Sequence, residues 1–293
     1  MIGQILKGYR IVEKIKDGSV GTIWKAVDRY DRDVALKQIS EKNARRPAKL
    51  RQFAREALLT RKLHHPGIVR VYEYVDDAGL PFFTMEYFPS ENLKFAMWHL
   101  PERVHKHEFH ILRQVAEALA YAHARGIVHR DVKPENVLVS PRSEVRLIDF
   151  SLAQTRWNRL FQIFRRTEGT PLYMSPEQIQ GRRCDPRSDI YSFGVLMYEI
   201  LTKRPPFLGT TEKALLEKHL KEPPPSMKTF VETISPEIDA LCARMLAKDP
   251  RDRFPDMTSI VYELSRWERK NTLVRLRQVE PARPRNPLGG PRP

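Results

Sequence analysis

The 293-residue sequence contains only two cysteines, Cys184 and Cys242, and no long apolar run. Two isolated cysteines exclude a disulfide framework and a Cys-x-x-Cys metal site, and they favour reduced thiols inside a cell. The longest apolar stretch, residues 193–201, contains Glu199 and is far shorter than the roughly 20 residues of a membrane span. The N-terminal residues have no apolar core behind a basic head, so we expect no signal peptide. We therefore expect a cytoplasmic protein without a transmembrane segment.

Acidic residues are also scarce relative to basic ones. The sequence has 36 Asp and Glu against 51 Lys and Arg, a net charge of +15. Such an excess admits nucleic acid, an anionic membrane surface or a phosphate-bearing ligand as a partner. With 41% hydrophobic and 30% charged residues, the composition is that of a folded globular protein. Its length corresponds to about two domains, or to two lobes that share a cleft.

Strand patterns dominate the first third of the chain and helix patterns the remainder. Strands are predicted at residues 9–15, 22–27, 33–39, 68–75 and 80–87, the first three as successive antiparallel strands. Helices are predicted at residues 50–63, 107–125, 188–201, 211–220, 236–246 and 257–266. Residues 271–293 contain five prolines and five arginines, and we expect this tail to be disordered.

Three features of the β-rich part suit the binding of a phosphate chain. Gly18 and Gly21 lie in a turn between two strands, where glycine lets backbone N–H groups approach phosphates. Lys37 interrupts an apolar strand, and a lysine in an apolar cleft needs a counter-charge. Glu56, on the following helix, is placed to supply it. Considered alone, a glycine turn is more often an ordinary β-turn, and a single lysine or glutamate is more often a surface or stabilising charge.

Two polar segments in the second part carry the chemistry. Residues 129–136, His-Arg-Asp-Val-Lys-Pro-Glu-Asn, are mostly polar and lie between two apolar, strand-like runs. Such a polar segment between buried strands is unlike an ordinary solvent-exposed loop. Residues 146–149 form a short apolar strand that ends on Asp149. Asp131, Asn136 and Asp149 together offer oxygen ligands and a base. A site with few protein oxygens suits Mg²⁺, which keeps water and phosphate oxygens in its shell.

These segments, in this order, resemble the eukaryotic-type serine/threonine protein kinase family, and most of all its bacterial members. The resemblance covers residues 9–268 and rests on Val-Ala-Leu-Lys at 34–37, the motif at 129–136, Asp-Phe-Ser at 149–151 and Ser-Pro-Glu at 175–177. It implies a bilobal α+β protein-kinase fold. The N-terminal lobe, residues 9–86, would be a five-stranded antiparallel sheet with one helix, and the lobe at 87–268 would be mostly helical.

The resemblance also implies a function, the transfer of the γ-phosphoryl group of ATP to Ser or Thr hydroxyls of a protein substrate that the sequence does not identify. Lys37, held by Glu56, would bind the α- and β-phosphates. Asp131 would accept the proton of the substrate hydroxyl, and Lys133 would neutralise the γ-phosphate. The metal ligands would be Asn136 and Asp149, holding Mg²⁺ or, as the alternative, Mn²⁺.

The rest of the implied ATP site is drawn from both lobes. The glycine turn would cover the phosphates, Met85 would be the gatekeeper, and the segment from Glu86 to Phe88 would read the adenine edge. The adenine would be sandwiched by four apolar residues, Ile15, Ile23, Ala35 and Leu138. Two residues depart from the family pattern: Lys16 replaces a loop glycine, and Ser151 replaces the glycine of Asp-Phe-Gly. Neither departure removes a ligand.

Regulation by phosphorylation of the activation segment is a further implication. Arg130, directly before the catalytic aspartate, can pair with a phosphate. Thr167 is the best-placed acceptor, ahead of Thr155 and Ser151. Thr170 would contact the catalytic residues and help to select Ser and Thr substrates.

An amphipathic pattern marks the same segment. Four apolar residues recur at helical spacing, Trp157, Leu160, Phe161 and Phe164. Four arginines surround them in the sequence. In the simpler interpretation this stripe packs against the kinase's own lobes. The alternative is a docking face for an acidic partner or an anionic surface.

Three other functions remain as alternatives at this point. A pseudokinase would bind nucleotide without catalysis, although such proteins usually lose a residue equivalent to Lys37, Asp131 or Asp149. A tyrosine or dual-specificity kinase is disfavoured by Lys133 and by the Gly-Thr-Pro stretch at 169–171. Nucleic-acid binding has no recognised module to support it.

Overall fold

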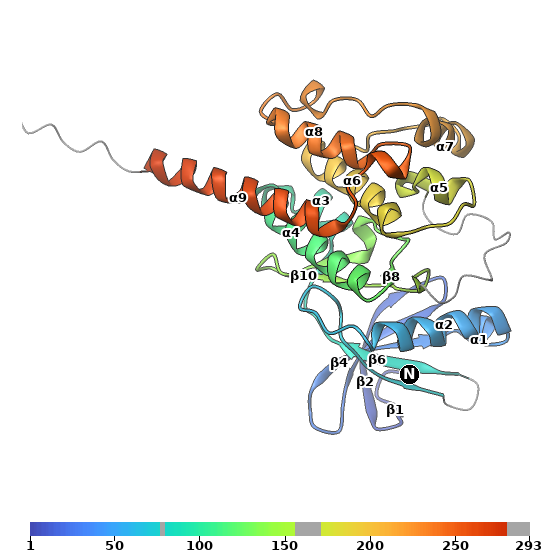
Figure 1. Cartoon of the computed structure of the whole chain (residues 1–293). Helices are drawn as coiled ribbons and strands as arrows, with labels where there is room; N and C mark the ends of the chain where they lie inside the picture. Colours follow the sequence, from blue (N-terminus) through green and yellow to red (C-terminus); the bar gives the residue numbers. More distant parts are fainter. Residues whose placement is uncertain (77–79, 156–170, 280–293) are drawn as a thin grey trace, which may run out of the picture.

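The computed structural model describes residues 1–76, 80–155 and 171–279. These residues form two lobes, a β-sheet lobe with two helices and a larger helical lobe, joined by residues 87–90 (Figure 1). This is the bilobal arrangement that the sequence predicts. None of the helices in these three ranges combines the length and the apolar character that crossing a membrane requires.

The sheet of the N-terminal lobe has the strand order β1-β2-β3-β4-β6-β5, and each neighbouring pair is antiparallel. The strands are β1 Ile5–Leu6, β2 Tyr9–Asp17, β3 Gly21–Val27, β4 Asp33–Ile39, β5 Val71–Val75 and β6 Phe82–Glu86. Two helices lie between β4 and β5 along the chain, α1 Glu41–Ala44 and α2 Pro47–Thr60.

Alternation along β4 divides the core of this lobe between two faces, because successive side chains of a strand point to opposite sides. Leu36 packs on one face in a cluster with Phe82. Ile39 packs on the other face in a cluster with Phe53 of α2. Lys37 is two residues from Ile39 and shares its face. The register of β4 therefore aims the lysine at α2.

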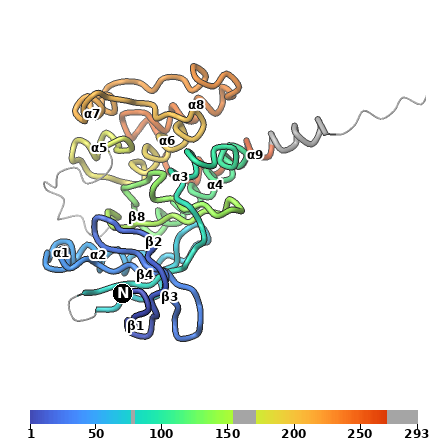
Figure 2. Tube along the Cα trace, turned by 180° about the vertical axis from the view of Figure 1, so that it is seen from behind, coloured from blue at the N-terminus to red at the C-terminus, as the bar shows by residue number. Residues whose placement is uncertain are grey.

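One large apolar core fills the helical lobe. Its helices are α3 Leu93–His99, α4 Pro101–Ala124, α5 Pro176–Ile179, α6 Pro186–Thr202, α7 Glu212–Lys221, α8 Pro236–Met245 and α9 Met257–Val279. Residues 188–202 of α6 are all buried, and α6 packs against α4 and α8. Both views show α6 at the centre of the lobe (Figures 1 and 2). The central helix can therefore anchor loops that reach it from several sides.

Short strands and 3₁₀ turns line the side of the helical lobe that faces the sheet. The strands are β7 Glu91–Asn92, β8 Ile127–Val128, β9 Val137–Val139, β10 Val145–Leu147 and β11 Gln154–Thr155. They pair as a three-stranded sheet, β10-β9-β7, and a two-stranded sheet, β11-β8. The 3₁₀ turns η1 Pro134–Asn136 and η2 Pro171–Tyr173 lie with these strands, which hold the polar motifs at the boundary between the lobes. Two more, η3 Met227–Thr229 and η4 Pro250–Asp252, lie elsewhere in the helical lobe, near α8 and α6.

Residues 9–86 contain the five antiparallel strands that the sequence predicts, β2 to β6, but two short elements of this lobe were not predicted. The sheet has a sixth strand, β1, which pairs with β2 through a tight turn at Lys7 and Gly8, both with positive φ. The lobe also has a second helix, α1, of a single turn. Both elements are too short to show a hydrophobic period in the sequence. Three predicted helices also begin earlier than expected, at Pro47, Pro101 and Pro186. Proline is favoured as the first residue of a helix, because the N–H group that it lacks would have no partner within the helix there.

The predicted start of the disordered tail at residue 271 is wrong as well. Helix α9 continues to Val279. The segment from 271 to 279 contains no proline, and the first proline of the tail is Pro281, so nothing in the backbone interrupts the helix before that point. The prediction for residues 280–293 lies outside the described residues.

Gly21 gives a test of the close approach between β3 and β4. A Cβ at Gly21 would lie 1.9 Å from the backbone oxygen of Gln38, whereas a Cβ at Gly18 would meet nothing closer than 3.3 Å. We expect Gly21→Ala to lower the free energy of unfolding by about 2 kcal/mol or more, as overpacking does, and Gly18→Ala to have a clearly smaller effect. Urea denaturation of both variants measures this. Equal losses would contradict the strand pairing described here.

Candidate active site

Lys37 and Glu56 form a buried ion pair between β4 and α2. Lys37 Nζ lies 2.6 Å from Glu56 Oε1 and 2.9 Å from Oε2. The Glu56 side chain is 6% exposed and that of Lys37 14% exposed. Burial raises the pKa of the Glu56 carboxyl, and the nearby Asp149 adds to the rise, although Lys37 opposes it. For Lys37, burial alone would lower the pKa, but the carboxylates of Glu56 and Asp149 outweigh it and raise it. The lysine is therefore a fixed cation.

The catalytic-loop motif brings Asp131, Lys133 and Asn136 together. Lys133 Nζ lies 2.8 Å from Asp131 Oδ2. Asn136 Nδ2 donates to the same carboxylate oxygen and to the backbone oxygen of Asp131, both at 2.9 Å. Asn136 is placed by η1, the turn that leads into β9. The carboxylate is thus held by two side chains from its own loop.

Asp189 of α6 holds the backbone of this loop from beneath. Its carboxylate accepts from the backbone N–H groups of His129 and Arg130 and from His123 Nε2, each at 2.7 Å. Burial would raise the pKa of Asp189, but the hydrogen bond from His123 and the other contacts lower it. Arg130 has a positive φ of 69°, a conformation that non-glycine residues rarely adopt. The paired N–H groups on the buried carboxylate hold this strained backbone directly before Asp131.

Asp149 follows β10 and faces Lys37. Its φ is 65°, and its carboxylate accepts from the backbone N–H of Ser151 at 3.2 Å. Burial would raise the pKa of Asp149, but the Lys37 charge and the Ser151 hydrogen bonds lower it. The next residue, Phe150, is fully buried, with its ring 4.6 Å from that of His129. Ser151 has no positive φ, so the residue that replaces glycine is unstrained in this conformation.

His129 links the loop to the strand that carries Asp149. Its Nδ1 accepts from the backbone N–H of Asp131 at 3.2 Å, which assigns the proton to Nε2. That nitrogen then donates to the backbone oxygen of Ile148 at 3.1 Å. His129 thus fixes the two carboxylate-bearing segments relative to each other.

The glycine turn is fixed by a residue that sequence reasoning missed. Gly18 N–H donates to the backbone oxygen of Gly21 at 2.8 Å, which closes the turn. Asn43 of α1 is buried, and its Nδ2 donates to the backbone oxygens of Ser19 at 2.8 Å and Val20 at 3.0 Å. An asparagine among charged residues gives no sequence signal for this role, because its partners lie more than twenty residues away.

The residues predicted for the adenine site lie on both lobes. Ile23 is on β3, Ala35 on β4 opposite Met85 of β6, and Leu138 on β9. Ile15, on β2, is 46% exposed. The structure therefore brings Ala35 and Met85 into direct register and leaves Ile15 on an exposed stretch of β2.

Glu86, predicted as the start of the hinge, is bound by a residue that the sequence did not single out. Arg146 of β10 donates from Nε to both Glu86 oxygens at 3.0 and 3.1 Å, and its Nη2 lies 2.9 Å from Oε1. The Arg146 guanidinium also lies 4.4 Å from the ring centroid of Phe88. The hinge is therefore joined to the helical lobe by an ion pair and a cation–π contact.

The donor set fits a hard divalent cation. Asn136 uses Nδ2 for Asp131, which leaves Oδ1 as an acceptor, and Asp149 supplies an ionised carboxylate. In the three described ranges no cluster of three His, Cys, Asp or Glu side chains forms a complete metal cage. Mg²⁺ needs few protein ligands where water and phosphate oxygens complete its shell.

Comparison of the sequence with known protein families identifies the family of this chain. The family described as "Protein kinase domain" matches residues 9–263. The chain belongs to the protein kinase family. The fold class inferred from the sequence is thereby confirmed.

Bacterial serine/threonine-protein kinases are among the relatives of this kinase chain, as the sequence resemblance suggested. A probable serine/threonine-protein kinase of Streptomyces coelicolor is 37% identical over 257 residues, covering 84% of this chain and 38% of the relative. PknL of Mycobacterium tuberculosis is 34% identical, covering 87% and 64%. PknB of Mycolicibacterium smegmatis is 33% identical, covering 88% and 42%. The chain thus spans between 38% and 64% of the length of these relatives.

Several predicted positions of the kinase's activation segment lie outside the described residues. These are Thr167, Thr170 and the apolar stripe at Trp157, Leu160, Phe161 and Phe164. The structure resumes at η2, and α5 follows with a capping box formed by Ser175 and Gln178.

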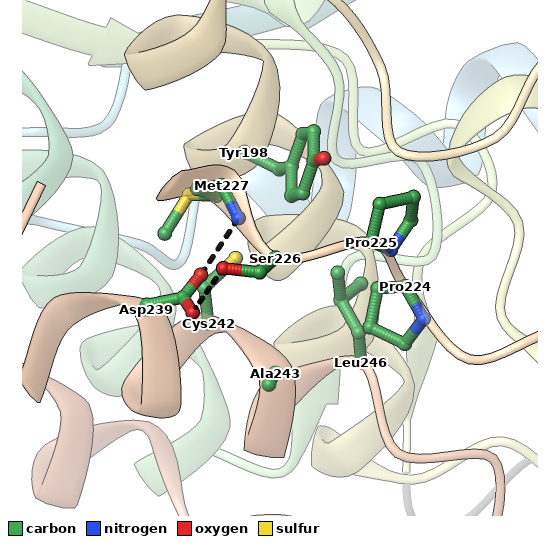
Figure 3. A pocket seen from close by; sticks show the side chains of 9 residues that line it. All are labelled: Tyr198, Pro224, Pro225, Ser226, Met227, Asp239, Cys242, Ala243 and Leu246. Carbon is green, nitrogen blue, oxygen red and sulfur yellow. Dashed lines mark hydrogen bonds between the residues drawn. The ribbon is translucent and has the colours of Figure 1, made fainter. Parts of the chain in front are cut away.

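A small cavity in the helical lobe is separate from the catalytic residues. It has a volume of about 140 Å³ and lies between the loop at 224–227, α6 and α8 (Figure 3). Its polar group is Asp239, whose carboxylate accepts from Ser226 Oγ at 2.6 Å and from the Met227 backbone N–H at 2.7 Å. Both acceptor oxygens are used internally to fix the loop, so we assign this cavity no role in phosphoryl transfer.

A buried ion pair secures the kinase segment that follows η2. Arg253, with a fully buried side chain, donates from Nη1 to Glu177 Oε1 at 2.8 Å and from Nη2 to Oε2 at 2.9 Å. Burial would raise the pKa of Glu177, but the hydrogen bonds and charge of Arg253 lower it. Such a bidentate pair is costly to break, because the remaining partner is left buried and uncompensated.

Arg253→Met tests this pair. We expect the variant to lose about 3–5 kcal/mol of unfolding free energy. Because the pKa of Glu177 is lower in the folded protein than in the unfolded chain, its ionised carboxylate stabilises the fold at pH values above the unfolded pKa. This stabilisation is lost as the pH falls through the pKa of the folded state. The native protein should therefore weaken between about pH 5 and pH 3, and the variant should lack this component. Urea denaturation at several pH values measures both effects. Arg251→Met, at an exposed pair with Asp249, is the control and should change little; equal losses in the two variants would contradict our account.

Proposed function

We propose that this kinase transfers the γ-phosphoryl group of ATP to Ser and Thr hydroxyls of a protein substrate. The observation that supports this is the meeting of two charge groups at the boundary of the lobes. Lys37 is paired with Glu56 and lies close enough to Asp149 for that carboxylate to raise its pKa. Asp131 is held by Lys133 and Asn136 on the loop next to it.

The residues have complementary tasks in this reaction. Lys37 binds phosphate oxygens of ATP, while its contact with Glu56 prevents it from swinging away. Asp131 orients the substrate hydroxyl and accepts its proton as the new O–P bond forms, and the bond between the γ-phosphorus and the bridging oxygen breaks to leave ADP. Lys133 neutralises charge on the transferring group. Positioning and electrostatics supply most of the catalysis, since the phosphoryl group needs no covalent partner on the protein.

Mg²⁺ is the metal that we propose, with Asn136 and Asp149 as its protein ligands. Two oxygen ligands from one narrow region suit an ion that keeps phosphate oxygens and water. When bound, it neutralises the phosphate charge.

The cytoplasm is the location that we propose, because it supplies ATP and suits the free, buried thiols of Cys184 and Cys242.

Phosphoryl transfer is tested with labelled ATP, magnesium and a generic protein substrate. We expect Asp131→Asn to lower kcat by roughly 10²–10⁴-fold, the usual contribution of a positioned general base. Lys37→Met should abolish most of the transfer through lost binding of the phosphates. Lys62→Met, at an exposed position just after α2, is the matched control and should leave the rate unchanged.

The outcomes separate the alternatives. Equal signal from the native protein, Asp131→Asn and Lys37→Met would refute catalysis by this site. Nucleotide binding without any transfer would identify a scaffold. Phosphoamino-acid analysis of the product distinguishes Ser and Thr from Tyr, and a product that contains phosphotyrosine would refute the proposed specificity.

We also propose that phosphorylation of the activation segment regulates this kinase. The Arg130 side chain has a buried Nε without a hydrogen-bond partner. Burial lowers the pKa of Arg55 in α2, and the nearby charge of Arg130 lowers it further. Arg55 Nη2 donates to the backbone oxygen of Ala153 at 2.7 Å, next to the segment that would carry the phosphate. Two neighbouring cations are stabilised when a phosphate lies between them.

The phosphate acceptor is tested by mass spectrometry. We expect active enzyme to carry phosphate on Thr167, and treatment with phosphatase to lower its activity. Thr167→Ala and Arg130→Gln should both remove the difference between treated and untreated enzyme, because each eliminates one side of the contact. Active enzyme with an unmodified Thr167 would show that the acceptor is a different residue.

A further inference from the structure

A buried carboxylate in α6 is shared by two elements that border the catalytic loop. Glu199 is 4% exposed. Its Oε1 lies 2.7 Å from Nζ of Lys94 in α3, and its Oε2 accepts from the hydroxyl of Tyr173 in η2. Both oxygens of the carboxylate are therefore occupied by groups of the same chain.

Tyr173 connects this carboxylate to the region where a substrate must lie. Its side chain ends on Glu199, and its backbone oxygen accepts from Ser192 Oγ of the same helix at 2.7 Å. The following helix, α5, is tied to the catalytic loop because Gln178 Nε2 donates to the backbone oxygen of Arg130 at 2.8 Å. Since Arg130 precedes Asp131, the chain from η2 to α5 borders the position of the acceptor hydroxyl.

A second carboxylate makes this region more negative. Glu135 belongs to η1, four residues after Asp131, and its charge acts on Tyr173. One of its oxygens, Oε2, is buried without a hydrogen-bond partner. Helix α3, which carries Lys94, packs directly against η1. Two carboxylates thus lie near Tyr173, and Lys94 is the cation that neutralises one of them.

Lys94 is the partly exposed partner of the buried Glu199. Its side chain is 29% exposed, whereas that of Glu199 is 5% exposed. A cation that approaches Glu199 therefore meets the Lys94 ammonium group on one of its oxygens. Because the pair with Glu199 is neutral as a whole, a basic side chain gains no net attraction at this place.

We propose that Lys94 is a specificity-determining residue of the kinase, an internal cation that occupies the place on Glu199 which a basic side chain of a substrate would otherwise take. The substrates selected are Ser or Thr sites that need no basic residue at the flanking position nearest Glu199. This inference rests on the proposed phosphoryl transfer and adds a rule for choosing among protein substrates.

The test uses a series of peptides that share one Thr acceptor and differ by Arg or Gln at a single flanking position. The native enzyme should give a ratio of kcat/KM, Arg over Gln, close to unity at each position. Lys94→Met keeps the apolar stem and removes the charge, so the ratio should rise at one position by about tenfold, equivalent to roughly 1.4 kcal/mol. KM for ATP should not change. Lys94→Arg retains the cation and should behave as the native enzyme does.

Two further variants keep the proposal testable if Lys94→Met does not fold. Glu199→Gln leaves the Lys94 cation without its partner, so the ratio should fall below that of the native enzyme. Lys94→Met combined with Glu199→Gln restores neutrality and should return the ratio to the native value. Active variants with native ratios would overturn the proposal. A native enzyme that transfers no phosphate to any substrate would instead refute the proposed function.

Discussion

The acceptor side of the site depends on a single buried carboxylate, that of Asp189. It accepts the backbone N–H groups of His129 and Arg130 and thereby holds Arg130 in a conformation with positive φ. That conformation sets the direction in which Asp131 leaves the loop. Because Asp189 lies in the buried part of α6, the position of Asp131, the proposed general base, follows from the packing of the whole helical lobe.

Charge balance organises the ATP side in a comparable way. Lys37 lies near two carboxyl groups, and their charges raise its pKa and keep it protonated. The pair with Glu56 restrains the lysine from α2, and Asp149 lies at the end of a strand of the other lobe. Assembly of the site therefore requires α2, β4 and β10 to be in place together. A change in the position of α2 would remove the restraint on Lys37 without altering any residue that contacts ATP.

The motif residues could be predicted from the sequence because each has a local signal. Lys37 interrupts an apolar strand, and Asp131 and Asn136 lie in a dense polar motif between apolar runs. Asn43, Arg146 and Lys94 have no such signal, since their partners lie between 23 and 105 residues away and depend on the tertiary fold. The bilobal fold was predictable from the order of strands and helices. The two-residue strand β1 and the single-turn helix α1 were not, because so few residues cannot show a period.

The contact between Arg146 and Glu86 gives the connection between the lobes a second attachment point. The covalent link at residues 87–90 alone would let one lobe turn relative to the other about several axes. Glu86 is also fixed to β10, and the backbone of Leu147 exchanges hydrogen bonds with Gly67 and Val69. The two lobes are therefore restrained at several places besides the covalent link, and a movement between them would have to break the ion pair or these hydrogen bonds. The ion-pair side chains are 19% and 24% exposed, so added salt would weaken this attachment, whereas the backbone hydrogen bonds between the lobes would keep their strength.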